Sequence, residues 1–232
     1  MTAHSGARTV AREVLADQVY SGLLAALLDS EYEPGHALSI EQVSRDFGVS
    51  ATPVREAMAR LEATGIVRRQ ALRGYTVTPL PTVQEYRDLM DARLAIEPVN
   101  TRLAAARIND DVIAQLEHTL ELQRSAPIGP TFSNYRQYFE ADERFHQVIA
   151  EAAGNEYLLA AYKALGGLVQ RFRQYSATGF VSDRTQAIAE HAEVFKALRE
   201  GDATAAEAHM ISHIAAARTR AIADAEAESG QE

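Results

Sequence analysis

The sequence predicts a mostly α-helical protein in two parts, a small N-terminal domain of helices with one β-hairpin and a C-terminal bundle of six helices. Apolar residues recur at helical spacing along most of the chain. Strong strand signals occur only before the Pro-containing segment 78–81, which can continue neither a helix nor a long strand. At 232 residues, the chain is long enough for two modest domains or one large one.

Local signals predict the first elements in order. A helix is expected over 11–29, where apolar residues form one stripe, and Pro34-Gly35 then forces a turn. A second helix is expected over 39–47, because its first residues have the form of a capping box. Gly48 can end this helix by adopting a positive φ.

The next elements suggest a nucleic-acid-binding domain. A third helix is expected over 50–64, ended by Gly65, and two short strands are expected over 66–70 and 75–78. Two short helices that meet at a Gly-containing turn and precede a hairpin are typical of a winged helix-turn-helix. We therefore expect residues 1–78 to form a DNA-binding domain.

Individual residues of the second helix of this motif have the chemistry for DNA contact. Arg55 lies one turn into the helix, where its guanidinium can reach a guanine edge or a phosphate. Ser50 and Thr52 lie near the helix N-terminus, where exposed amides also favour phosphate. Gly74 permits a tight hairpin turn from which Arg73 can enter the minor groove.

Composition and charge limit the class of protein. The chain has no cysteine, which excludes disulfides and thiolate metal sites, and its N-terminus lacks the apolar core of a signal peptide. We therefore expect a cytoplasmic protein with no membrane partner. The net charge of −9 argues against indiscriminate nucleic-acid binding, yet no acidic residue occurs between Ala63 and Gln84. The alternative is a hairpin whose arginines are merely solvated.

The second domain is expected over 83–228, after a linker at 79–82. Short breaks separate its helices, as in a helical bundle. The expected helices are 82–107, 109–125, 132–153, 155–177, 183–200 and 203–227.

Four side chains of the bundle form a candidate metal site: Asp142, His146, His191 and His213. Asp142 and His146 are four residues apart and therefore lie on one helical face. Three helices can bring all four together in the core of a bundle. Three imidazoles and a carboxylate suit Zn²⁺, Ni²⁺, Mn²⁺ or another divalent ion. Taken singly, each histidine is more typical of a surface or satisfied core residue.

The N-terminal residues resemble the DNA-binding domain of the GntR family of bacterial transcription regulators. The resemblance covers about residues 10–80 and rests on GVSATPVREAMARLEATGIV and the RGYTV hairpin. It implies that the N-terminal end of the recognition helix, with Arg55, contacts the operator and that the wing tip enters the minor groove. Ala51 stands where many relatives have arginine, and Arg45 or Arg73 is a candidate to replace that contact.

The second domain resembles FCD, the effector domain of FadR-type GntR regulators. The resemblance rests on the DxxFH step, the EH pair and a histidine twelve residues beyond Gly201. It implies that the aspartate and three histidines bind a metal, beside a pocket for a small carboxylate-bearing metabolite. Six helices favour the metal-bearing, VanR-like branch. Arg93 matches a position that is frequently arginine, and it can bind a carboxylate or pair with Glu97 one turn later.

The sequence thus predicts a homodimeric, ligand-responsive transcription regulator, more often a repressor in this family. Its winged helices would bind two half-sites of a near-palindromic operator. Dimerisation follows from the resemblance alone. Two alternatives are a metal sensor without an organic effector and a helical metalloenzyme, and the enzyme is disfavoured because no obvious general base lies beside the site.

Overall fold

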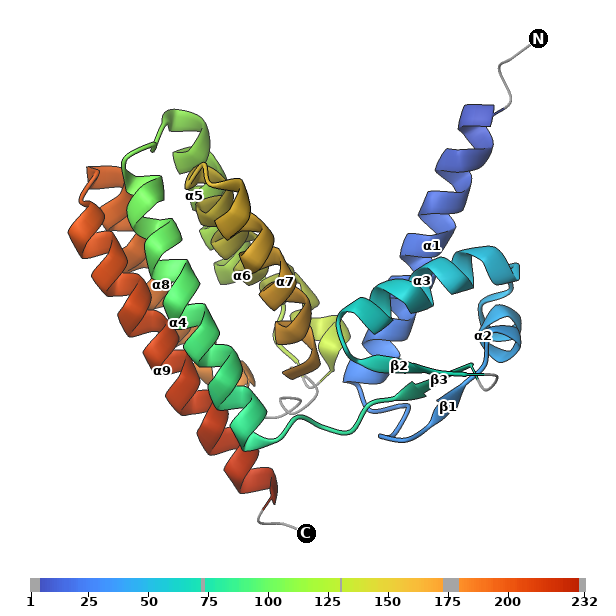
Figure 1. Cartoon of the computed structure of the whole chain (residues 1–232). Helices are drawn as coiled ribbons and strands as arrows, with labels where there is room; N and C mark the ends of the chain where they lie inside the picture. The colour runs from blue at the N-terminus through green and yellow to red at the C-terminus, as the bar shows by residue number, and fades with distance from the viewer. Residues whose placement is uncertain (1–4, 72–73, 130, 173–179, 230–232) are drawn as a thin grey trace. The chain divides into compact units, whose positions relative to one another are not determined.

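The computed structural model describes residues 5–71, 74–129, 131–172 and 180–229 (Figure 1). Over these residues the chain is mostly helical, with one small antiparallel sheet, and it divides into two compact units, Met1–Leu80 and Pro81–Glu232. The predicted fold class is confirmed. No helix in the described part of the chain is long and apolar enough to cross a membrane.

The N-terminal unit combines three helices with a three-stranded sheet. The central strand of the sheet is Gly74–Val77, and it pairs antiparallel with the other two strands. Thr76 lies opposite Ala37 of one neighbour, and Val77 lies opposite Val67 of the other. The first strand was not predicted, because two residues are too few to produce an alternating pattern, and the first helix begins earlier than expected. The elements are α1 (Ser5–Leu28), β1 (Ala37–Leu38), α2 (Ile40–Phe47), α3 (Ala51–Ala63), β2 (Val67–Gln70) and β3 (Gly74–Val77).

The turn between α2 and α3 is fixed by local contacts. The Ser39 hydroxyl accepts a hydrogen bond of 3.0 Å from the backbone N–H of Gln42, and this bond caps the start of α2. Gly48 ends α2 with φ at +64°, a conformation that favours glycine. The inner face of α3, including Val54, Met58 and Leu61, is fully buried, so the outer face is left to solvent.

The C-terminal unit is a bundle of six helices in its described residues. Polar side chains begin two of them: Thr82 and Glu85 form a capping box, and the Asn109 side chain accepts from the Val112 amide at 2.9 Å. The helices are α4 (Val83–Ala105), α5 (Asp110–Ser125), α6 (Phe132–Ala152), α7 (Glu156–Phe172), α8 (Phe180–Glu200) and α9 (Ala203–Ser229).

Apolar packing aligns the bundle helices in a way that matters for the site. In Figure 1, α4 runs alongside α9, and the two are in extensive contact. Fully buried apolar side chains come from several helices, among them Leu116 of α5, Phe145 of α6, Val194 of α8 and Ile214 of α9. The three histidines described next are therefore surrounded by closely packed apolar side chains.

Candidate metal centre and nucleic-acid interface

Three imidazoles from three helices converge in the bundle core. His191 of α8 places its Nε2 3.2 Å from the Nε2 of His146 on α6 and 3.1 Å from the Nε2 of His213 on α9. The exposed fractions of the three residues are 4% or less. Because three helices supply one nitrogen each to a single point, a cation there would be enclosed by the core.

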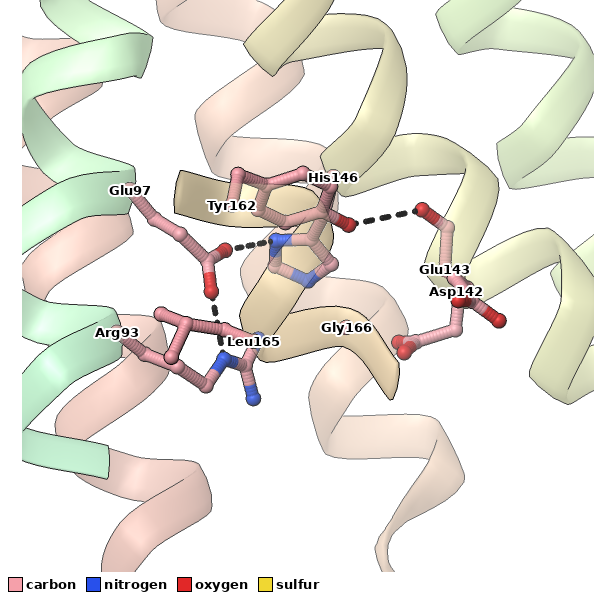
Figure 2. A pocket seen from close by; sticks show the side chains of 8 residues that line it. All are labelled: Arg93, Glu97, Asp142, Glu143, His146, Tyr162, Leu165 and Gly166. Atoms are coloured by element: carbon pink, nitrogen blue, oxygen red, sulfur yellow. Dashed lines mark hydrogen bonds and ion pairs between the residues drawn. The ribbon is translucent and has the colours of Figure 1, made fainter. Parts of the chain in front are cut away.

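Carboxylates orient two of these rings. Nδ1 of His146 lies 2.6 Å from an Oε2 of Glu97 on α4, as drawn in Figure 2. Nδ1 of His213 lies 2.8 Å from Oε2 of Glu190, the residue before His191. Acceptors at both Nδ1 atoms place a proton there, so the Nε2 atoms are left with lone pairs.

An amide orients the third ring. Nδ1 of His191 lies 2.9 Å from Oε1 of Gln123 on α5. The Gln123 Nε2 donates to the Ala141 carbonyl at 3.3 Å, so the amide must present its oxygen to the imidazole. All three rings then direct Nε2 lone pairs at one another, an arrangement that a bound cation would stabilise. Acceptors behind ligating histidines are the usual supporting contacts of metal sites.

Burial keeps two of these imidazoles, His191 and His213, in the neutral form that binds metals. The pKa of His191 is lowered well below its usual value, first by burial and then by His213 and His146. Burial also lowers the pKa of His213, although the hydrogen bond from its ring to Glu190 acts in the opposite direction. A neutral imidazole that carries its proton at Nδ1 can coordinate an ion through Nε2 without first releasing a proton.

The supporting carboxylates remain ionised despite burial. Burial alone would raise the pKa of Glu97, but Arg93 and His146 outweigh it and lower that pKa. Burial likewise opposes ionisation of Glu190, whose pKa His213 and Arg220 lower to about 2. The Arg220 guanidinium donates to this carboxylate through Nη1 at 2.8 Å and through Nη2 at 3.1 Å. Two anions therefore lie behind the triad, which adds to its attraction for a cation.

Asp142 lies at the edge of the triad. Its Oδ1 is 3.7 Å from Nε2 of His191, and its side chain is 23% exposed. Two donors about 2.1 Å from a tetrahedral ion are about 3.4 Å apart, so the separations of the His191 Nε2 from the other two Nε2 atoms are close to those around one ion. Of the four residues that the sequence singled out, the structure gathers the three histidines into one cluster and places Asp142 beside His191, outside that cluster.

A small cavity is lined by both His146 and Asp142 (Figure 2). Its volume of about 20 Å³ has room for roughly one water molecule. Arg93 lies on its wall and pairs with Glu97 at 2.5 Å, the second of the two roles expected for this arginine. The lining residues are Arg93, Glu97, Asp142, Glu143, His146, Tyr162, Leu165 and Gly166.

The residues expected to contact DNA lie on the outer side of the helix-turn-helix. Thr52 and Arg55 are exposed on α3, Ser50 is exposed just before it, and Arg45 is exposed on α2. Ser50 makes no capping bond with its side chain, so the first amides of α3 have no cap from this hydroxyl. This arrangement leaves donors and one guanidinium at the start of the helix.

The wing turn depends on a glycine. Gly74 has φ at +87°, and a Cβ atom there would lie 2.7 Å from the Leu38 carbonyl oxygen. Only glycine fits both constraints. Arg68 and Arg69 of β2 are exposed beside this turn, whereas Arg73 lies outside the described residues.

Sequence reasoning missed most of the supporting contacts. The sequence indicates Glu97 only as a partner of Arg93 and indicates no role for Gln123 or Glu190. Glu190 is the first residue of the EH pair on which the family resemblance rests, but that pattern alone gives its side chain no role. Gln123 carries no local signal, because it approaches His191 only through the packing of α5 against α8.

Two family models match the chain. The model described as bacterial regulatory proteins, gntR family, matches residues 15–77, and the FCD domain matches residues 88–216. The FCD match alone covers more than half of the chain. The two matches fall in the N-terminal and C-terminal units respectively.

Relatives of known description are transcription regulators and not enzymes. The HTH-type transcriptional repressor RspR of Escherichia coli (strain K12) is 32% identical over 197 residues, which cover 85% of this chain and 84% of RspR. The uncharacterized HTH-type transcriptional regulator YdhC of Bacillus subtilis (strain 168) is 24% identical, over 84% of this chain and 86% of YdhC.

Solved structures share the fold. E. coli McbR/YncC superposes with a TM-score of 0.67 at 20% identity, over 86% of this chain and 93% of that one. A putative GntR regulator from Rhodococcus sp. RHA1 gives a TM-score of 0.68 at 19% identity, over 90% and 97%. With the family matches, these findings show that the chain belongs to the GntR family of bacterial transcription regulators, with an FCD domain after its DNA-binding domain.

Proposed function

We propose that this DNA-binding regulator is controlled by a small carboxylate bound at a divalent metal ion in its FCD domain. The observation that carries the proposal is that Nε2 of His191 lies 3.1 to 3.2 Å from the Nε2 atoms of His146 and His213, while an oxygen lies 2.6 to 2.9 Å from Nδ1 of each ring. Lone pairs held this close favour a shared cation. The proposed ligands are Asp142, His146, His191 and His213.

The donor set suits a borderline ion. Three imidazole nitrogens and one carboxylate oxygen match Zn²⁺, Ni²⁺ or Mn²⁺, and a bound ion would supply a Lewis-acidic docking point for an anion. Asp142 borders the cavity, so free coordination positions would face it. A carboxylate entering there would meet both the ion and the guanidinium of Arg93.

Binding of such a ligand requires the cavity to change. A volume of about 20 Å³ excludes any metabolite, and Arg93 is already held by Glu97. A carboxylate must therefore compete for this guanidinium or displace the wall. Because the two cavity states differ, the ligand shifts a conformational equilibrium. Arg93 lies on α4, which follows the linker from the DNA-binding unit directly in the chain.

For the DNA-binding unit we propose contacts from α3 and the wing in a homodimer that binds a near-palindromic operator. Repression is the proposed sign of regulation, since the relative RspR carries that description. The exposed guanidinium of Arg55 has the position for a base or phosphate contact. The proposed contact residues are Arg45, Ser50, Thr52, Arg55, Arg73 and Gly74.

The same cavity supports a second candidate function, a metal sensor without an organic ligand. Space for about one water molecule is enough to complete the coordination of an ion, and it requires no movement of the wall. This candidate differs from the first in one outcome, because operator binding would respond to metal alone.

One experiment tests both candidates. Binding of the protein to the DNA upstream of its own gene is measured by fluorescence anisotropy. Three samples are compared: metal-free protein, Zn²⁺-loaded protein, and Zn²⁺-loaded protein with acetate, succinate or citrate. A response to a carboxylate that requires Zn²⁺ supports the first candidate. A response to Zn²⁺ that no carboxylate changes supports the sensor, and no Zn²⁺ binding at all contradicts both.

A further inference from the structure

A buried arginine holds the end of α5. Arg184 of α8 is 9% exposed, and its guanidinium donates to four backbone carbonyls. Nη2 binds those of Gln123 at 2.5 Å and Arg124 at 2.7 Å, and Nη1 binds those of Ala126 at 2.8 Å and Pro127 at 3.4 Å. The last carbonyls of a helix lack intrahelical partners, and the helix dipole is negative there, so a cation is well placed.

The helix end that Arg184 holds carries the amide that orients His191. The Gln123 side chain is fully buried, with Oε1 at 2.9 Å from Nδ1 of His191 and Nε2 at 3.3 Å from the Ala141 carbonyl. Ala141 directly precedes Asp142. Gln123 of α5 thus contacts both α6 and α8, and each of these helices carries proposed ligands.

Arg184 and His191 lie on the same side of α8. They are seven residues apart, or two helical turns, and both side chains reach Gln123, one through its backbone and the other through its side chain. Movement of the α5 end would therefore change the distance and direction of the amide relative to the imidazole. The Nε2 of His191 would then no longer point at its two counterparts.

We propose that Arg184 is a positioning residue for the metal centre, acting through Gln123 to hold the His191 ring in its ligating orientation. The proposal rests on the proposed metal function. A guanidinium is suited to this task because its planar donors reach four carbonyls at once, which an ammonium cannot do. The alternative is that Arg184 only closes the end of α5 and contributes to folding without affecting the ion.

Substitution of Arg184 should weaken metal binding. Arg184→Met keeps an unbranched apolar stem and loses every donor, and loss of a supporting contact of this kind typically costs about 10–100-fold in affinity. The dissociation constant for Zn²⁺ is measured by competition with a chromophoric chelator, and the absorption spectrum of the Co²⁺-loaded protein reports the ligand geometry. The Zn²⁺ affinity of Arg184→Lys should lie between those of wild type and Arg184→Met. Arg199→Met is the matched control, because Arg199 is exposed on the same helix, over Phe195.

A second variant separates positioning from stability. Gln123→Leu removes the amide directly, so Arg184→Met added to it should weaken Zn²⁺ binding by less than about 3-fold further, since coupled residues are non-additive. If Arg184→Met does not fold, the same cycle is run with Arg184→Lys. Thermal denaturation of the metal-free variants measures the contribution to folding.

The outcomes are distinct. Weaker Zn²⁺ binding, an altered Co²⁺ spectrum and non-additivity with Gln123→Leu support the proposal. Unchanged Zn²⁺ affinity with a lower melting temperature, or full additivity in the double variant, overturns it and leaves Arg184 with a folding role. Failure of the wild-type chain to bind Zn²⁺ would instead contradict the proposed metal function.

Discussion

The two units of this regulator place their functional groups in opposite environments. In the N-terminal unit the candidate contact side chains that the structure describes are exposed at α2 and α3: Arg45, Ser50, Thr52 and Arg55. In the C-terminal unit the candidate ligands come from three helices, and the three histidines among them are buried. The supporting residues Glu97 and Gln123 come from two further helices and are buried as well. We therefore expect the two sites to respond differently to mutation. Loss of an exposed contact should weaken DNA binding alone, whereas loss of a buried residue should change both metal binding and the stability of the fold.

The largest effect should come from the triad. His191→Ala removes one ligand and leaves the buried Gln123 amide without its partner, so the stabilisation by metal should disappear. At a metal concentration of about 1,000 times the dissociation constant, that stabilisation is about 4.1 kcal/mol. Thermal or chemical denaturation with and without Zn²⁺ measures it.

His209→Ala is the control for this prediction. His209 lies one turn before His213 on α9 and is half-buried, but it has no place in the triad. Its variant should keep the full response to Zn²⁺. An equal response of the His191 and His209 variants would refute the difference that we draw between these two histidines.

A smaller effect, confined to DNA binding, is expected in the N-terminal unit. Arg55→Ala should weaken operator binding by about 1–3 kcal/mol if the guanidinium makes a bidentate base contact. The melting temperature should stay within error, because the side chain is exposed. A gel-shift titration together with thermal denaturation checks both parts.

Arg60→Ala provides a matched comparison on the same helix. The Arg60 guanidinium pairs with Asp17 at 2.5 Å and lies over the Tyr20 ring, both on α1, so it has contacts within the domain. We expect its loss to change operator affinity less than the loss of Arg55. If Arg60→Ala has the larger effect, the proposed orientation of the recognition helix is wrong.

The smallest expected effect is a pH dependence of the metal-free bundle. Folding lowers the pKa of His191 and of His213, so below about pH 6.5 the unfolded chain binds more protons than the folded one. Stability should therefore be complete above this pH and decline as the pH falls below it. Urea denaturation between pH 7.5 and pH 5.5 should show the decline, and His191→Ala should reduce it. A wild-type curve that is flat over this interval would argue against neutral, buried imidazoles.

The same contrast explains what could be predicted from sequence. Helices α2 and α3 and the hairpin follow from nearby signals such as the Ser39 cap and the positive-φ glycines at 48 and 74. The fold class follows from periodicity, whereas the two-residue strand β1 has no pattern of its own. The three histidines stand out because their type and spacing match a family. Gln123 and Arg184 could not be found in this way, because their roles depend on the packing of α5 against α8.

Metal content after zinc loading and gel filtration gives the most direct test of the buried centre, by elemental analysis of wild type and of the His146, His191, His213 and His209 alanine variants. We expect one ion per chain in wild type and in His209→Ala, and strongly reduced content in the other three. A wild-type chain that retains no zinc, or triad variants that retain as much as wild type, would contradict the assignment of this cluster as a metal site.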